Sequence, residues 1–424
     1  MSDSSRNTRR AATVSLAVLA GVNLLNYLDR YVVSAVLPAL KHGPLGLSDL
    51  QLGTLMSGFL IVYMLAAPLF GRLGDRGSRT RPIAIGVFLW SLATGLSGLA
   101  RNYLQLLGAR AAVGIGEAAY GTIAPALLAD HFPLRSRGRA FALFNMAIPV
   151  GAALGYIIGG LVEAHYGWRA AFFAAGLPGL ALAVWVWRLP DPPRGAQEAD
   201  SLLHAKPTAA AGSWQVYARL LRQPAYVLTV LGYAAYTFAL GGMAFWMPTF
   251  LERSRGVPLV SATAGFGEIV VVTGILGTFA GGWLGDYCLK FSPQAYLWFS
   301  GWITLLAVPA TYLALASGVP WVFYGALTVA ELLLFMSSGP INAVIVNLVS
   351  PVERACAVAL SVFTIHALGD VISPSIIGGI ADASSLATAV LIVPVAVALC
   401  ALLWLFAARA DRLAQRATNA LSMT

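Results

Sequence analysis

Long apolar segments alternate with short polar ones along nearly the whole chain. Each apolar segment has about 20 residues, the length that an α-helix needs to cross the hydrocarbon core of a bilayer. The pattern predicts twelve spanning helices, over residues 14–40, 49–71, 82–100, 103–129, 138–163, 168–188, 224–251, 259–287, 292–314, 319–348, 354–381 and 385–408. It is therefore typical of an all-α membrane protein.

One longer polar stretch, 189–223, interrupts the series and is rich in proline, alanine and glycine, as linkers are. Within it, Ser213 is placed to cap a short amphipathic helix that begins at Trp214 and lies at the inner interface. The predicted organisation is a cytoplasmic tail (1–13), a six-helix bundle (14–188), a cytoplasmic linker (189–223), a second six-helix bundle (224–408) and a cytoplasmic tail (409–424).

Composition and charge agree with a membrane location. Of the 424 residues, 58% are hydrophobic and 11% are charged, whereas a soluble domain has about 25% charged residues. The net charge of +9 does not indicate nucleic-acid binding, because the basic residues lie between apolar segments and form no stripe. With the N-terminus inside, the outer loops hold few of the basic residues, namely Lys41, Arg101, Arg169, Arg253 and Arg255. This bias predicts both termini in the cytoplasm.

The two predicted bundles share sequence features. Gly71-Arg-Leu-Gly-Asp75 recurs as Gly282-Trp-Leu-Gly-Asp286, and Gly159-Gly160 recurs as Gly378-Gly379, each about half a chain length later. Repeats related by an axis along the membrane normal imply a central cavity between the halves near the bilayer midplane. Such an arrangement favours transport by alternating access.

The segment Gly71 to Arg81 resembles the cytoplasmic signature between helices 2 and 3 of the major facilitator superfamily. Its glycines let two helix ends approach closely, and Asp75 is expected to pair with arginines across an inner gate and to release them when the gate opens. Plain topology-setting charge accounts for several of the arginines. The predicted gate residues are Gly71, Gly74, Asp75, Arg76 and Arg79, with Gly282, Gly285 and Asp286 in the second half.

The fifth predicted helix has glycines at regular spacing. Gly151, Gly155, Gly159 and Gly160 make a smooth face for close helix packing. The run resembles the glycine motif of proton-coupled antiporters in the superfamily, except that Tyr156 replaces the proline. Helix packing alone also explains it.

Charged residues inside the predicted spans are the most informative feature. Each costs about 2.5–3.5 kcal/mol at mid-bilayer on insertion scales unless it is paired or solvated. They are Asp29 and Arg30 in the first helix, Arg110 and Glu117 in the fourth, and Glu331 and His366 in the second half, with Glu268 and Asp370 as weaker candidates. We expect the first six to line a route for substrate and protons.

Asp29 and Glu117 are the candidate proton carriers. Burial favours the neutral form of a carboxyl group and a nearby arginine favours the ionised form, so a carboxylate between these influences can load and release a proton. Arg30 and Arg110 are then counter-ions or ligands for an anionic headgroup. Asp29–Arg30 and Arg110–Glu117 are alternatively static ion pairs. Neighbours on a helix point to different faces, so Asp29 and Arg30 need partners on other helices.

Two runs are similar to the spinster subgroup of the major facilitators: Asn26-Tyr-Leu-Asp-Arg-Tyr31 in the first helix and Gly108 to Ala119 in the fourth. The resemblance implies that Asp29, Arg30, Arg110 and Glu117 line the substrate and proton route. Animal spinster proteins are associated with lysophospholipids and phosphorylated sphingoid bases, so the resemblance favours an amphiphilic, lipid-like substrate. Drugs or organic anions carried by the same fold, and a lipid sensor or scramblase without coupling, remain alternatives.

No nucleophile–base set, phosphate-binding glycine loop or metal-ligand spacing is present in the sequence. We therefore expect neither an enzyme nor a catalytic residue, metal site or cofactor, with a proton as the coupling ion. The expected partners are membrane lipids, protons and an amphiphilic small molecule. The expected setting is a bacterial inner membrane, with the protein as a monomer.

Overall fold

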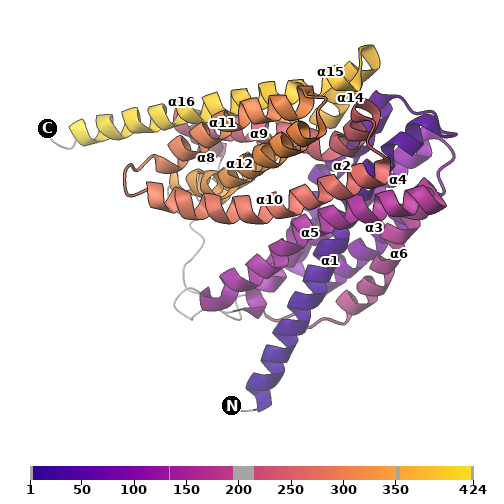
Figure 1. The fold of residues 1–424 in the computed structure, drawn as a ribbon. Helices are drawn as coiled ribbons and strands as arrows, with labels where there is room; N and C mark the ends of the chain where they lie inside the picture. Colours follow the sequence, from indigo (N-terminus) through magenta and orange to yellow (C-terminus); the bar gives the residue numbers. More distant parts are fainter. Residues whose placement is uncertain (1–2, 133, 194–213, 350–353, 422–424) are drawn as a thin grey trace. The chain divides into compact units, whose positions relative to one another are not determined.

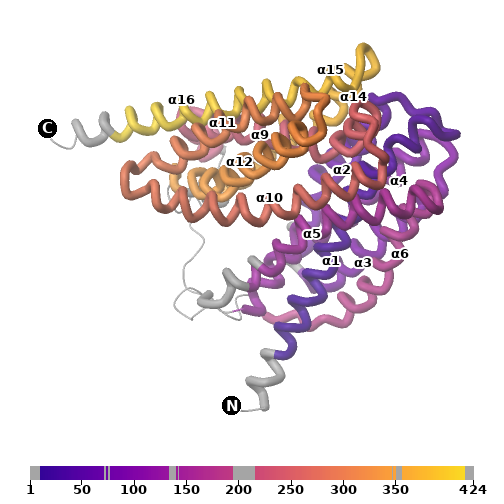
Figure 2. Tube along the Cα trace, viewed as in Figure 1, coloured from indigo at the N-terminus to yellow at the C-terminus, as the bar shows by residue number. Residues whose placement is uncertain are grey.

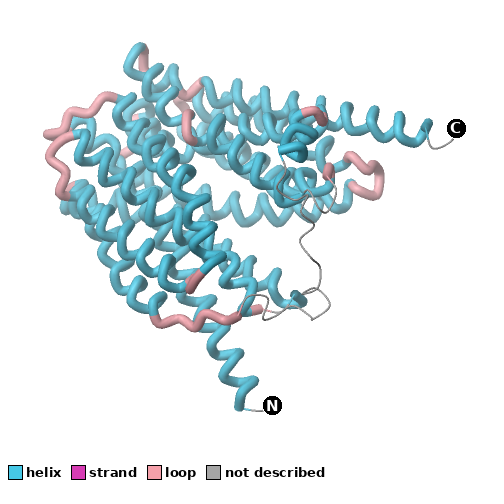
Figure 3. The backbone as a smooth tube through the Cα atoms, turned by 180° about the vertical axis from the view of Figure 1, so that it is seen from behind, coloured by secondary structure: helices cyan, strands magenta, loops and turns pink. Residues whose placement is uncertain are grey.

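The structure is a computed structural model that describes residues 3–132, 134–193, 214–349 and 354–421. Within these ranges the chain forms helices joined by turns and loops, and no strand occurs (Figure 1, Figure 3). Figure 2 traces the same chain as a tube through the Cα atoms. The prediction of an all-α protein is therefore confirmed for the described residues.

The helices before the linker follow the predicted spans closely. They are α1 (Asp3–His42), α2 (Asp49–Arg76), α3 (Thr80–Gly98), α4 (Tyr103–His131), α5 (Leu134–Tyr166) and α6 (Trp168–Trp187). The short helix α8 (Trp214–Leu221) lies within the predicted linker, 189–223, at the place where an amphipathic helix is predicted. Its predicted cap, Ser213, lies outside the described residues.

The second half has helices of the same kind with two interruptions. They are α9 (Pro224–Arg255), α10 (Leu259–Cys288), α11 (Ala295–Ala316), α12 (Pro320–Asn347), α13 (Arg354–Ile365), the π-helix η1 (His366–Asp370), α14 (Ser373–Ala383), α15 (Leu386–Ala389) and α16 (Ile392–Leu421). The single helix predicted over 354–381 is thus divided at His366–Asp370. The Thr237 hydroxyl on α9 donates to the carbonyl of Ile365, directly before this wide turn, at 2.9 Å.

Eleven stretches of described helix are long and apolar enough to cross a membrane. The predicted third span corresponds to α3, which is not among them. This helix has 19 residues, and Arg81, Ser91 and Thr94 lower its hydropathy.

The chain divides into two compact units. The first contains residues 1–206 together with Pro248–Glu268, and the second contains Pro207–Met247 together with Ile269–Thr424. The end of α9 and the start of α10 therefore pack with the helices of the first half. The predicted halves, 14–188 and 224–408, stay a prediction.

The glycine face of α5 lies against α1 in the first unit. A methyl group on Gly155 would come within 2.6 Å of the Leu28 carbonyl oxygen, and one on Gly159 within 2.8 Å of Ala35 Cβ. Only a hydrogen side chain permits such an approach, so any larger residue separates the two helices. Gly151 faces α1 in the same way, whereas Gly160 faces Thr263 on α10. This packing holds the α1 segment that carries Asp29 and Arg30.

Candidate functional site

Two acid–base pairs connect α1 with α4 in the first unit. Arg110 Nη1 donates to Asp29 Oδ1 at 3.0 Å, and Arg30 Nη2 donates to Glu117 Oε2 at 2.7 Å. Asp29 and Arg30 are neighbours on α1 and point about 100° apart, so each reaches a different residue of α4. Arg110 and Glu117 are two turns apart and share a face. The pairs therefore run between helices and not within them.

The cluster is almost completely removed from solvent. The side chains of Asp29 and Arg110 are each 1% exposed and that of Glu117 is 0% exposed, while Arg30 is 14% exposed. Charges withdrawn from water are tolerated only when they are paired and hydrogen-bonded. Arg30 is therefore the member of the cluster that an incoming ligand can reach.

The two carboxylates differ in how many of their oxygens have donors. Asp29 Oδ2 accepts a hydrogen bond from the Thr94 hydroxyl on α3, so both of its oxygens are occupied. Glu117 Oε1 is buried and has no hydrogen-bond partner among the described residues. A proton can add at this oxygen without displacing the Arg30 guanidinium from Oε2. The geometry therefore favours Glu117 over Asp29 as the group that takes up a proton.

Aromatic rings complete the surroundings of Arg30. Its guanidinium carbon lies 4.9 Å from the ring centre of Tyr27, 5.0 Å from that of Phe59 and 5.7 Å from that of Tyr63. The Arg110 guanidinium carbon is 5.6 Å from the Phe59 ring centre. Rings at these distances attract a cation through their quadrupoles. Tyr27, Phe59, Tyr63 and Thr94 escape sequence reasoning because aromatic and hydroxyl residues are common in apolar helices.

Two glycines on α4 bring Glu117 into the bundle. A methyl group on Gly114 would come within 2.5 Å of the Phe59 carbonyl oxygen on α2, and one on Gly116 within 2.7 Å of the Trp90 amide nitrogen on α3. Helix α4 consequently packs closely against both neighbours, and Glu117 follows directly after Gly116. The small residues of this run thus determine how deeply the carboxylate lies.

The predicted site residues of the second half lie in the second unit. Glu331 on α12 is 2% exposed, and no hydrogen bond or ion pair joins its carboxyl group to another described residue. His366 Nδ1 lies 2.9 Å from Asp370 Oδ1 across the π-helix, with the two side chains 27% and 24% exposed. Thr237 and Gly241 bring α9 close to this turn. Glu331 and His366 are thus placed on different helices and do not pair with each other.

Arg79 is the centre of an ion-pair network at one end of the first unit. It donates to Asp130 at the end of α4, and through its backbone amide and Nε to both oxygens of Asp191, at 2.7 and 2.8 Å. Burial opposes the charge, but the hydrogen bonds to the two aspartates prevail and raise the pKa of Arg79 above its ordinary value. Asp130 and Asp191 did not emerge from the sequence because each lies far along the chain from Arg79.

The remaining gate residues are only partly described. The backbone of α2 runs through the motif and includes Gly71, but the side chains of Asp75 and Arg76 are not described. Gly74 is buried, and a methyl group there would come within 2.9 Å of Ile123 on α4. In the second half, Asp286 is exposed and accepts a hydrogen bond from the Tyr296 hydroxyl at 2.6 Å. Of its neighbours in the motif, Gly285 faces Pro340 and Gly282 has open space beside it.

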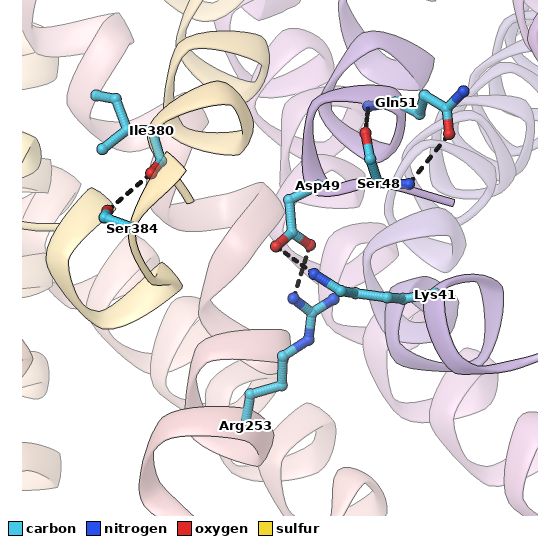
Figure 4. Close-up of polar contacts among 7 residues, drawn as sticks. All are labelled: Lys41, Ser48, Asp49, Gln51, Arg253, Ile380 and Ser384. Carbon is cyan, nitrogen blue, oxygen red and sulfur yellow. Dashed lines mark hydrogen bonds and ion pairs between the residues drawn. The ribbon is translucent and has the colours of Figure 1, made fainter. Parts of the chain in front are cut away.

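A second ion-pair network lies at the start of α2 (Figure 4). Asp49 is 3% exposed and accepts hydrogen bonds from Lys41 at 2.5 Å and from Arg253 at 2.7 Å, one on each carboxylate oxygen. Ser48 and Gln51 form a capping box with bonds of 3.0 and 3.2 Å that begins the helix immediately before Asp49. Arg253 comes from the end of α9, so this network joins both halves of the sequence inside the first unit. The sequence showed Lys41 and Arg253 only as loop charges.

Comparison with known proteins identifies the family. Residues 19–374 match the model of the Major Facilitator Superfamily. The chain is 36% identical over 393 residues to Protein spinster homolog 1 of Mus musculus, and the alignment covers 88% of this chain and 74% of that protein. This chain belongs to the spinster proteins of the major facilitator superfamily.

Other relatives and solved structures agree. Protein spinster of Drosophila melanogaster is 32% identical to this spinster chain over 387 residues, covering 88% of the chain and 62% of that protein. The crystal structure of a bacterial homologue of the human lysosomal transporter Spinster, inward-facing and unoccupied, has a TM-score of 0.83 at 24% identity and covers 94% and 97% of the two chains. The nucleoside transporter NupG has the same fold, with a TM-score of 0.73, 12% identity and coverage of 93% and 99%.

The predictions of family and fold are thereby confirmed. The spinster chain is a multi-pass membrane transporter of the major facilitator fold and not an enzyme. The α1 and α4 runs on which the resemblance rested carry the four charged residues that pair in the structure.

Proposed function

We propose that this spinster protein is a proton-coupled transporter that moves an amphiphilic, lipid-like substrate by alternating access. The substrate class is a lysophospholipid or a phosphorylated sphingoid base. The observation that carries the proposal is the buried cluster between α1 and α4, in which Glu117 Oε1 lacks a donor among the described residues and Arg30 is partly exposed.

Coupling follows from the shared position of Glu117 and Arg30. When Glu117 binds a proton, the negative charge 2.7 Å from the Arg30 guanidinium disappears. The guanidinium then needs another counter-charge, and the phosphate of a lipid headgroup supplies one with a geometry that suits arginine. Proton and headgroup thus favour each other's binding. Tyr27, Phe59 and Tyr63 offer an apolar surface beside the same guanidinium.

The other predicted residues are proposed to serve the same cycle. Asp29 and Arg110 hold the cluster in place, and Glu331 and His366 continue the proton route in the second half. The motif around Asp75 and Asp286 is proposed as the cytoplasmic gate, and the excess of arginine in the alternate loops supports cytoplasmic termini. We propose that the protein works as a monomer in a bacterial inner membrane.

The test is uptake of labelled lysophospholipid into proteoliposomes of the purified protein, with and without an imposed pH gradient. We expect the gradient to increase uptake. Glu117→Gln should abolish this increase and keep residual, gradient-independent exchange. Glu163→Gln, which removes a partly buried carboxyl group near the end of α5, is the matched control and should respond to the gradient as the wild type does.

Two outcomes would contradict parts of the proposal. Gradient-driven uptake that survives Glu117→Gln unchanged would refute the coupling role of that residue. No lysophospholipid uptake under either condition would exclude the lipid substrate, and drugs and organic anions would then be tested in the same vesicles.

A further inference from the structure

A groove of about 400 Å³ runs between α3 and α6 on the surface of the first unit. Ala84 and Ala183, which are 2% and 5% exposed, form its floor because their small side chains leave space between the helices. Phe88, Val184 and Trp187 stand beside it and are 48%, 51% and 54% exposed. The groove is therefore almost entirely apolar and open to the outside.

The exposed side of α3 is suited to contact with hydrocarbon. Its exposed large apolar residues recur every three or four positions and thus form one stripe along the helix, made of Ile85, Phe88, Leu89, Leu92 and Leu96. In a transporter of this fold, such a stripe faces the acyl chains of the bilayer. An acyl chain fits an apolar groove within such a stripe, whereas water gains nothing from entering it.

Two arginines stand at the same end of the groove. Arg188 directly follows Trp187 at the end of α6, and Arg81 lies one turn before Ile85, on the same face of α3. Both are exposed, and neither side chain has a partner among the described residues. Both belong to the segments that the distribution of basic residues places in the cytoplasm. Trp187 is the last residue of α6, and tryptophan is enriched at the ends of spanning helices, near the lipid headgroups.

We propose that this groove is a binding site for one anionic phospholipid of the cytoplasmic leaflet. One acyl chain lies between Phe88 and Val184, and the headgroup phosphate lies between Arg81 and Arg188. The two arginines select an anionic lipid. Arginine binds phosphate with two parallel hydrogen bonds, and a zwitterionic headgroup carries a cation that the arginines repel. A second copy of this chain would bring the same arginines together, so a lipid is the favoured occupant. The site uses none of the residues of the α1–α4 cluster.

Native mass spectrometry of the full chain in detergent, titrated with phosphatidylglycerol or phosphatidylcholine of the same acyl chains, tests the proposal. We expect one phosphatidylglycerol to bind more tightly than any phosphatidylcholine. An arginine near an anionic lipid surface contributes about 1 kcal/mol, or about fivefold in affinity, so Arg81→Gln/Arg188→Gln should weaken this binding roughly 25-fold. Arg409→Gln/Arg412→Gln removes two exposed arginines from α16 and is the matched control, which should bind as the wild type does.

The location is tested separately with a phosphatidylglycerol that carries a photoreactive group on one acyl chain. Cross-links should map to peptides of α3 and α6 and should disappear in the Arg81→Gln/Arg188→Gln variant. Equal binding of the two lipids, or a phosphatidylglycerol preference that the double variant keeps, would overturn the proposal. Cross-links that map elsewhere, or a lipid-free dimer through this face, would do so as well.

Discussion

Replacing Asp29 by asparagine should destabilise the protein more than replacing Glu117 by glutamine. Asp29→Asn leaves the Arg110 guanidinium, 1% exposed, without its charged partner at 3.0 Å. Removing one member of a buried ion pair costs about 3–5 kcal/mol, because the other charge stays buried and uncompensated. Glu117→Gln leaves Arg30, which is 14% exposed and lies against three aromatic rings. Its cost should be smaller, about 1–3 kcal/mol.

The double variant Asp29→Asn/Arg110→Met provides the decisive comparison. It removes both charges and fills the space of the arginine with an apolar side chain, a type of replacement that is often neutral. We therefore expect it to be more stable than Asp29→Asn alone, although it carries one more change. Reversible unfolding in mixed micelles, followed by tryptophan fluorescence, measures the three free energies of unfolding.

A double variant less stable than Asp29→Asn alone would refute the reasoning that Asp29 and Arg110 compensate each other. The same proteins separate the two roles left open by the sequence. A double variant that is stable and transports normally would show that this pair is only structural. One that is stable and inactive would show that its charges act in transport.

Three further predictions concern other contacts of the first unit, each measured as a free energy of unfolding in the same micelles. Asp49→Asn should cost more than Lys41→Gln, because it leaves two cations unpaired and Lys41 is 28% exposed; equal costs would contradict the shared role of Asp49. Arg79→Lys should cost about 1–3 kcal/mol because an ammonium group cannot serve both aspartates in the geometry of the guanidinium, and a silent substitution would refute this. Gly155→Ala should lower the free energy of unfolding by about 1–3 kcal/mol, because the new methyl group meets α1. Gly325→Ala, which has open space around it, should leave stability unchanged or raise it slightly. A larger loss of stability for Gly325→Ala than for Gly155→Ala would contradict the packing.

Much of the candidate site was visible in the sequence because charge inside an apolar span is rare. Asp29, Arg30, Arg110 and Glu117 were found in this way, and helix periodicity already required partners on other helices for Asp29 and Arg30. Which acid pairs with which base was beyond sequence reasoning. That choice depends on how α4 is rotated and how closely Gly114 and Gly116 let it approach α2 and α3.

The sequence by itself determined the membrane class, most of the helix spans and the family, because all three follow from local composition and short motifs. Only the tertiary structure decided the contacts between distant segments: Thr94 on Asp29, Asp130 and Asp191 on Arg79, and Arg253 on Asp49. It also showed that the eleventh predicted span is broken by a π-helix at His366–Asp370. The physical reason is that spanning depends on hydropathy summed over about 20 residues, whereas a pair depends on the position of a few atoms from separate helices.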